Sequence, residues 1–326
     1  MCIRDSGNLS QLLRGEFTGR GTALRRLGRR SFIEGNDAFE IGSVHSSIVP
    51  RPWQILPVAF LGMTQPGMTQ HTTNNTHDDL AFGVDIGGSG VKGALVNVRT
   101  GELVSERQKI KTPQPSTPDA VAEVVRQLVD AEHWDGPVGI TVPSVVREQV
   151  ALTAANIDPL WIGTHVQDLF QGHLGAREIT VLNDADAAGL AEVRFGDPTA
   201  RTGAVMMLTF GTGIGTALLI DGELYPNTEL GHLPFGSTTA EKYASSKVRE
   251  KENLSYADWA QRVDEVMHAY SKLFNPLTFV VGGGISRDAD RWVPLLTVEQ
   301  DVVPAQLRNE AGIIGAALAV KENTKP

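Results

Sequence analysis

Residues 83–96 read GVDIGGSGVKGALV, in which an apolar run ends in small residues and a second apolar run follows at once. Glycines permit backbone conformations closed to other residues and let a ligand approach the main chain closely. Asp85 stands where the first predicted strand ends, so its carboxylate is expected to point into the turn. The glycines match G-x-G-x-x-G, but a dinucleotide fingerprint must open a helix, whereas residues 94–98 predict another strand. A glycine hairpin that binds no ligand remains an alternative for this segment alone.

The arrangement of strand, small-residue turn and strand occurs a second time, over residues 205–220. The second turn reads GTGIGT at 211–216, and the turns that follow also agree, with TGEL at 100–103 and DGEL at 221–224. Two such loops in register are much more specific than either one. We interpret them as the mark of an internal duplication.

Length, cysteine content and net charge exclude several classes of protein. The chain has 326 residues, enough for two domains with cores of their own, and 41% of them are hydrophobic. No apolar run approaches the roughly 18 residues that a membrane span needs. The single cysteine, Cys2, excludes an intramolecular disulfide framework and a zinc site built from cysteines, and it fits a reducing, cytoplasmic setting. The formal net charge of −9 argues against nonspecific binding of nucleic acid.

Residues 1–67 differ from the rest of the chain, because their basic residues are all arginine and their net charge is +3, which leaves −12 for residues 68–326. The opening MCIRDS resembles translated sequencing-adapter sequence. We therefore expect residues 1–79 to be a non-native or disordered leader, with Met68 as the natural start. An arginine-rich targeting peptide is the alternative.

The spacing of apolar residues, together with residues that typically begin or end helices and strands, predicts the secondary structure after residue 79. Helices are expected over 118–132, 185–194, 239–252, 255–273 and 304–326, and buried strands over 137–142, 179–182, 205–210 and 278–281. The strand at 179–182 delivers Asn183 and Asp184 to a helix N-terminus. A carboxylate at that place is either an N-cap, worth about 1 kcal/mol, or a catalytic base.

Three motifs together resemble the ROK family of sugar kinases: DIGG at 85–88, LNDADAAG at 182–189 and ELGH at 229–232. The resemblance covers residues 80–326. It implies an α/β fold of the actin-like ATPase (ribonuclease H-like) type, with duplicated domains and a cleft between them. The expected domains are 80–183 and 184–303, with the C-terminal helix packing back on the first.

The resemblance also implies the site residues. Asp184 would be the general base, and the expected glucose ligands are Asn156, Asn183, Asp184, Glu229 and His232. The expected phosphate-binding residues are Asp85, Gly87, Gly88, Ser89, Gly90, Lys92, Thr209, Gly211, Thr212 and Gly213. Gly282, Gly283 and Gly284 would face a nucleotide, and Asp85 would hold Mg²⁺ through water. Zinc-containing members place a further glutamate after their cysteines, and Glu241 is a guess for that role.

Some of these residues have simpler readings. Asn156 could be a loop asparagine that bonds its own backbone. Glu229 and His232 could be an exposed surface pair, and the glycines at 282–284 a tight turn between strand and helix.

Within the family, the chain most resembles the polyphosphate-dependent glucokinases of actinobacteria, on TFGTGIG at 209–215, SSKVRE at 245–250 and PAQLRNEAG at 304–312. The implied reaction moves a terminal phosphoryl group from polyphosphate, or ATP, to the 6-hydroxyl of glucose with Mg²⁺, and a homodimer is expected. A strictly ATP-dependent glucokinase or other hexose kinase would share every motif. A ROK repressor is a weaker alternative, because residues 1–79 show no paired amphipathic helices.

Polyphosphate carries about one charge per phosphate, so the acidic body of the protein would repel it unless positive charge were gathered locally. The best gathering is Lys242, Lys247, Arg249 and Lys251, where helical spacing would put Lys247 and Lys251 on one face. We expect these four residues to form a polyphosphate groove. An ordinary solvated helix face is the alternative.

Overall fold

The structure is a computed structural model that describes residues 77–154, 157–324 and 326. Its first sheet grows from the glycine hairpin, whose strands β1 (Leu80–Gly87) and β2 (Gly90–Asn97) pair antiparallel with Asp85 directly opposite Lys92. β5 (Val138–Val142) and then β8 (Ile179–Asn183) add in parallel to β1. β3 (Glu102–Leu103) and β4 (Gln108–Ile110) pair with β2, so the order is β3-β2-β1-β5-β8 with β4 also beside β2.

The second sheet repeats this topology. β9 (Ala204–Phe210) and β10 (Ile214–Ile220) form the antiparallel hairpin, and β14 (Thr278–Gly282) and β15 (Asp301–Pro304) add in parallel. β11 (Glu223–Tyr225) pairs with β10, giving the order β11-β10-β9-β14-β15. Strand for strand, this is the order of the first sheet, so the duplication predicted from the two glycine turns is present in the fold.

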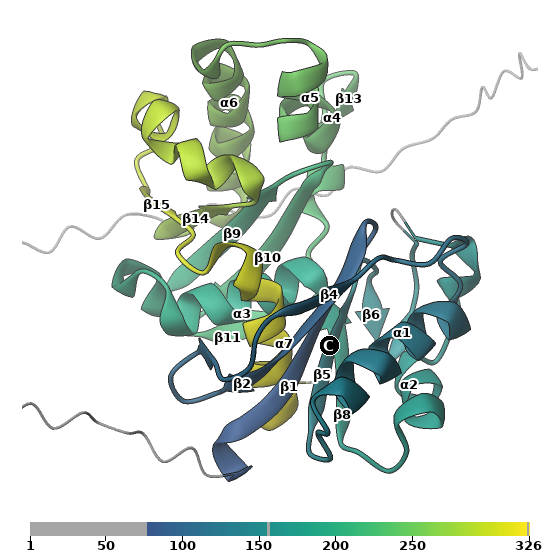
Figure 1. The fold of residues 1–326 in the computed structure, drawn as a ribbon. Coiled ribbons are helices and arrows are strands. Elements are labelled where there is room, and N and C mark those ends of the chain that lie inside the picture. The colour runs from purple at the N-terminus through teal and green to yellow at the C-terminus, as the bar shows by residue number, and fades with distance from the viewer. Residues whose placement is uncertain (1–76, 155–156, 325) are drawn as a thin grey trace, which may run out of the picture. The chain divides into compact units, whose positions relative to one another are not determined.

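One face of each sheet is covered by its own helices (Figure 1). α1 (Pro118–Ala131) and α2 (Val166–Leu174) close one hydrophobic core over the first sheet, and α6 (Tyr256–Phe274) closes another over the second. The predicted start of α6 is confirmed, since the Ser255 hydroxyl accepts a hydrogen bond from the Asp258 N–H. None of the described helices is both long and apolar enough to cross a bilayer.

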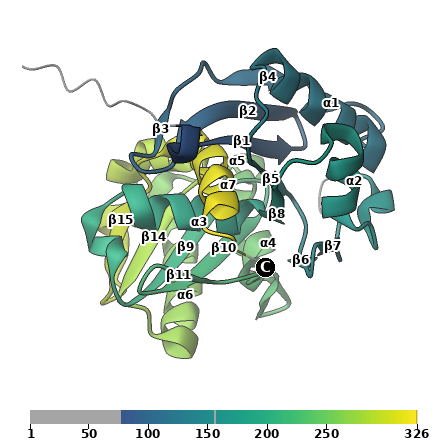
Figure 2. The same cartoon turned by 90° about the horizontal axis from the view of Figure 1, so that it is seen from below.

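The third core lies between the sheets and is built on α3 (Asp184–Phe195) and α7 (Ala311–Lys321). α7 packs against β1 and β5, α3 packs against β9 and β10, and the two helices pack on each other (Figures 1 and 2). Because α7 is covered on nearly every side, almost all of its residues are small or apolar and buried.

Glycines set the distance of this packing. A Cβ at Gly139 of β5 would lie 1.7 Å from the carbonyl oxygen of Ala316, and one at Gly315 of α7 would lie 1.8 Å from that of Ala187. No side chain fits at such a separation, so the close approach of α7 to β5 and α3 depends on these two glycines.

Shorter elements complete the described chain: the hairpins β6 (Val146–Arg147)/β7 (Val150–Ala151) and β12 (Pro234–Phe235)/β13 (Thr238–Thr239), the helices α4 (Ala240–Ala244) and α5 (Ser246–Lys251), and the 3-10 segments η1 (His77–Asp79), η2 (Pro159–Trp161), η3 (Pro198–Arg201), η4 (Leu230–His232), η5 (Gly284–Arg291), η6 (Val293–Leu295) and η7 (Arg308–Glu310).

Two predicted helices are wrong in extent. The helix expected over 239–252 is divided at Ser245, which is extended (φ −66°, ψ 159°), because the next residues turn toward the second glycine loop. There the Ser246 hydroxyl and the Lys247 N–H both donate to the carbonyl of Gly211, at 3.0 and 3.1 Å. The C-terminal helix begins at Ala311, because residues 301–304 are taken up as the edge strand β15.

Candidate active site

Asp184 is the first residue of α3, at the end of β8. The residue that caps the helix is its neighbour Asn183, whose Oδ1 accepts hydrogen bonds from the N–H groups of Ala185 and Asp186 at 2.8 and 3.2 Å. Asn183 is fixed in turn by its Nδ2, which donates to the carbonyl of Ser144. The carboxylate of Asp184 also accepts a hydrogen bond from the Ala185 N–H, at 2.9 Å. Since Asn183 does the capping, the carboxylate of Asp184 is available for chemistry.

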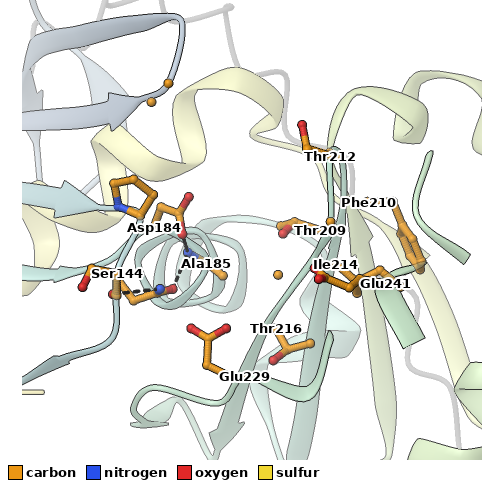
Figure 3. Close-up of a pocket in the computed structure, with 18 of the residues that line it drawn as sticks. Ser144, Asp184, Ala185, Thr209, Phe210, Thr212, Ile214, Thr216, Glu229 and Glu241 are labelled. Carbon is orange, nitrogen blue, oxygen red and sulfur yellow. Dashed lines mark hydrogen bonds between the residues drawn. The ribbon is translucent and has the colours of Figure 1, made fainter. Parts of the chain in front are cut away.

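Asp184 faces a cavity of about 860 Å³ between the turns of the two glycine hairpins (Figure 3). The first turn contributes Gly87, Gly88 and Ser89, and the second contributes Thr209 and residues 211–213. Figure 3 shows Thr209 and Thr212 on the β9–β10 hairpin across the cavity from Asp184, with Glu229 near Asp184. The structure thus brings the predicted base and both predicted phosphate loops to one cavity.

The electrostatics of the cavity favour a proton on Asp184. The residue opens into the cavity, but protein surrounds its carboxyl group on the other sides. This burial is the main cause that raises the pKa of Asp184 to about 7, and the negative charges of Asp85 and Glu229 raise it further, against the Ala185 N–H bond. A carboxylate with a pKa near neutrality is suited to accept a proton in a reaction at physiological pH.

In the first glycine loop, Asp85 is held from two sides. Lys92 donates from Nζ to its Oδ2 at 2.6 Å, and the Thr141 hydroxyl donates to its Oδ1 at 3.2 Å. Gly87, Gly88 and Ser89 line the described cavity, whereas Asp85, Gly90 and Lys92 do not. The carbonyl of Gly87 accepts a hydrogen bond from the Thr112 hydroxyl at 2.5 Å. Only part of the predicted phosphate loop therefore lines the cavity.

Two glutamates flank one histidine beside the second glycine loop, where a Cβ at Gly213 would lie 2.3 Å from the Oε2 of Glu241. The Nδ1 of His232 lies 3.8 Å from Glu229 and its Nε2 lies 3.6 Å from Glu241, and all three residues line the cavity. Burial raises the pKa of Glu229, and the charge of Glu241 adds to this while His232 opposes it. Glu241 thus lines the same cavity as the other two, and its role in sugar binding stays a prediction. Asn156, the remaining predicted glucose ligand, lies outside the described residues.

Comparison with known proteins identifies the family. The model of the ROK family matches residues 81–247, just over half of the chain. The chain belongs to the ROK family. A polyphosphate glucokinase of Mycobacterium tuberculosis is 49% identical to it over 263 residues, which cover 80% of this chain and 99% of that relative.

Solved structures agree with this assignment. An inorganic polyphosphate/ATP-glucomannokinase from Arthrobacter sp. strain KM matches with a TM-score of 0.70 and 43% identity, over 75% of this chain and 99% of its own. A ROK family glucokinase from Streptomyces griseus, in complex with glucose and AMPPNP, matches with a TM-score of 0.63 and 25% identity, over 73% and 98%. These matches confirm the predicted fold class.

In this ROK protein only some of the residues predicted to bind a nucleotide or polyphosphate line the described cavity. Of Gly282, Gly283 and Gly284, Gly283 lines the described cavity, with a φ of 87° that suits glycine. Of the four predicted groove cations, Lys247 lines the cavity, at the N-terminal end of α5. Lys242 and Lys251 are exposed, and the Arg249 guanidinium lies over the Tyr256 ring, 3.9 Å from its centre.

Sequence reasoning missed several residues of this ROK site. Thr153 lines the cavity from the segment after β7, and Thr228 lines it next to Glu229. Asp186 and Asn227 support that wall from behind through a hydrogen bond of 2.8 Å. The only signal in the sequence for this pair is the second aspartate of LNDADAAG, because Asn227 lies 41 residues further along the chain.

Proposed function

We propose that the chain is a phosphotransferase that moves the terminal phosphoryl group of polyphosphate, or of ATP, to the 6-hydroxyl of glucose. The observation that carries the proposal is the carboxylate of Asp184 in a cavity bounded by two glycine loops, next to Asn183, which caps α3. The likeness to a relative named polyphosphate glucokinase, over 99% of its length, supports the choice of donor and acceptor.

In phosphoryl transfer the protein mainly positions the two substrates and neutralises charge, and it takes little part in covalent chemistry. Asp184 accepts the proton of the sugar hydroxyl as the bond to phosphorus forms. Glu229, His232, Glu241 and Asn156 would bind the other hydroxyls of the sugar. The N–H groups of the two glycine loops would cradle the donor phosphates.

The donor set around Asp85 is compatible with Mg²⁺. This ion usually keeps several waters and is held by one or two carboxylates together with substrate phosphates, so it needs no dedicated cage of protein ligands. Within the described residues, no group of three or more His, Cys, Asp and Glu side chains is arranged to hold a metal. Asp85 would hold the ion through water beside the donor, where Mg²⁺ supplies neutralisation of the phosphate charge.

The experiment is a donor and acceptor matrix with the purified protein. Glucose and mannose are each offered with long-chain polyphosphate or ATP, and the sugar 6-phosphate is measured; mannose is included because the similar Arthrobacter protein is named a glucomannokinase. Glucose 6-phosphate with polyphosphate is the expected result. Product with ATP alone would make the chain a strictly ATP-dependent kinase, and no product with either donor would refute the proposal. The expected homodimer remains a prediction, to be measured by light scattering.

A further inference from the structure

The first turn of α3 is anchored to the wall of the cavity on both sides of Asp184. Before it, Asn183 donates to the carbonyl of Ser144 at 3.1 Å. After it, the fully buried Asp186 accepts the N–H of Asn227 at 2.8 Å through Oδ2. The other oxygen of Asp186, Oδ1, is buried and has no hydrogen-bond partner among the described residues. Among the described residues, the one hydrogen bond of the Asp186 carboxyl group is therefore to the backbone of a distant loop.

The side chain of Asn227 continues the connection. Its Oδ1 accepts the N–H of Val146 at 2.8 Å and its Nδ2 donates to the carbonyl of Val146 at 2.6 Å. One amide side chain thus satisfies both main-chain groups of a residue 81 positions away, as a neighbouring strand would. Asn227 has a φ of 61°, a conformation that asparagine tolerates better than most residues.

Val146 and Asn227 each lie two residues from a residue that lines the part of the cavity proposed to bind the sugar. Val146 follows Ser144 by two residues, and Asn227 precedes Glu229 by two residues; Ser144 and Glu229 both line the cavity. The wall at Ser144 belongs to the segment after β5 of the first sheet, and Glu229 belongs to the segment after β11 of the second. The hydrogen bonds of Asn227 are therefore made between the two halves of the site.

We propose that Asp186 and Asn227 form a clasp that sets the distance between these walls around Asp184. Asp186 fixes the backbone of Asn227, and the amide of Asn227 holds Val146. Both are positioning residues, since neither lines the described cavity. The inference rests on the proposed function, because it assigns the clasped walls to the sugar.

The test is Asn227→Gly, which keeps the positive φ free of strain and removes the side chain with its amide. The matched control is Asn253→Gly, since Asn253 also has a positive φ (52°) but is exposed in the turn after α5. We expect KM for glucose to rise about tenfold in Asn227→Gly, while kcat and KM for the donor change less than about threefold, because uniform binding of the sugar is what is lost. Asn253→Gly should match the parent protein.

A second variant and a second readout keep the inference open to refutation. Asn227→Asp retains the shape and the acceptor but loses the Nδ2–H donor and sets a carboxylate against the Val146 carbonyl, so it should also raise KM for glucose. Hydrogen exchange of the Val146 amide, measured without substrate, should be at least about tenfold faster in Asn227→Gly.

The outcomes separate the clasp from the proposed function. Unchanged exchange at Val146, or faster exchange with an unchanged KM for glucose, would overturn the clasp. If the parent protein phosphorylates no sugar while Val146 exchange still accelerates in the variant, the proposed function fails and the contact between the two walls stands without its role in sugar binding.

Discussion

Lys92 and Asp85 face one another across β1 and β2, with the Nζ of Lys92 2.6 Å from the Oδ2 of Asp85. The side chains are only 25% and 17% exposed, so water screens the pair weakly. Along the hairpin, the pair lies two residues from the Gly87–Gly90 pair that closes the turn proposed to bind the donor. Lys92 therefore orients Asp85 in the free protein, in addition to the phosphate-binding role expected for it.

Removal of the Lys92 charge should destabilise the protein. For Lys92→Gln we expect the free energy of unfolding to fall by about 1–3 kcal/mol, since a partly buried carboxylate loses a charged hydrogen-bond donor. Urea denaturation measures this, and Arg126→Gln, which breaks exposed ion pairs on α1, should have a much smaller effect. Adding Asp85→Asn should recover part of the loss, and strictly additive effects of the two changes would show that the pair is not coupled.

Asp184→Asn should leave the fold intact and lower kcat by about 10² or more, with little change in glucose binding, because the proton acceptor is removed while the cap made by Asn183 remains. Steady-state kinetics and calorimetric binding of glucose measure the two effects. Asp168→Asn, on the exposed surface of α2, is the control for the substitution itself. Turnover at the parent rate would remove Asp184 from the mechanism.

The raised pKa of Asp184, about 7, predicts an acidic limb in the pH profile. The base works only when ionised, and below pH 7 a growing fraction carries a proton, so kcat/KM for glucose should fall as the pH is lowered through about 7. The value of kcat/KM reports the free enzyme, to which this pKa applies. An activity that stays flat down to pH 5 would contradict either the pKa or the role, and the residual activity of Asp184→Asn should lack this limb.

If Lys242, Lys247, Arg249 and Lys251 form the expected polyphosphate groove, the two donors should respond differently to its removal. Replacing Lys247 and Lys251 by alanine should raise KM for long polyphosphate far more than KM for ATP, because a long polyanion needs an extended strip of cations. The loss should grow as salt is lowered, because screening weakens. Arg201→Ala with Lys272→Ala removes two exposed cations outside the described cavity lining and serves as the control. Equal losses for both donors would make α5 an ordinary solvated helix.

Replacement by alanine should have opposite effects on stability at two helical glycines, Gly315 of α7 and Gly172 of α2. Gly315→Ala should lower the free energy of unfolding by about 3 kcal/mol or more, since its Cβ would meet the backbone of Ala187 at 1.8 Å. Gly172→Ala should raise it by about 0.5–1 kcal/mol, because Gly172 lies within α2 and a Cβ there meets nothing within 4 Å. Thermal or urea unfolding measures both, and equal effects would mean that the close approach of α7 does not limit stability.

The sequence alone predicted what short segments encode. The two glycine turns between strands, the start of α3 at the end of β8 and the cap of α6 at Ser255 each depend on residues within a few positions of one another. The repeat of two such turns was enough to predict a duplicated fold. The placement of Asp184 at a helix N-terminus left two roles open, because a cap and a catalytic base have the same local pattern.

Tertiary structure assigned the cap to Asn183, because the carbonyl that fixes Asn183 comes from Ser144, 39 residues earlier. The role of Asp184 as the base remains a proposal. Tertiary structure likewise divided the expected helix at Ser245, through the carbonyl of Gly211, and placed Glu241 beside His232. It paired Asn227 with Val146, which no local pattern relates. Local propensity is determined by neighbours along the chain, whereas the hydrogen-bond partners of buried polar groups are determined by which segments the packing of α3 and α7 brings together.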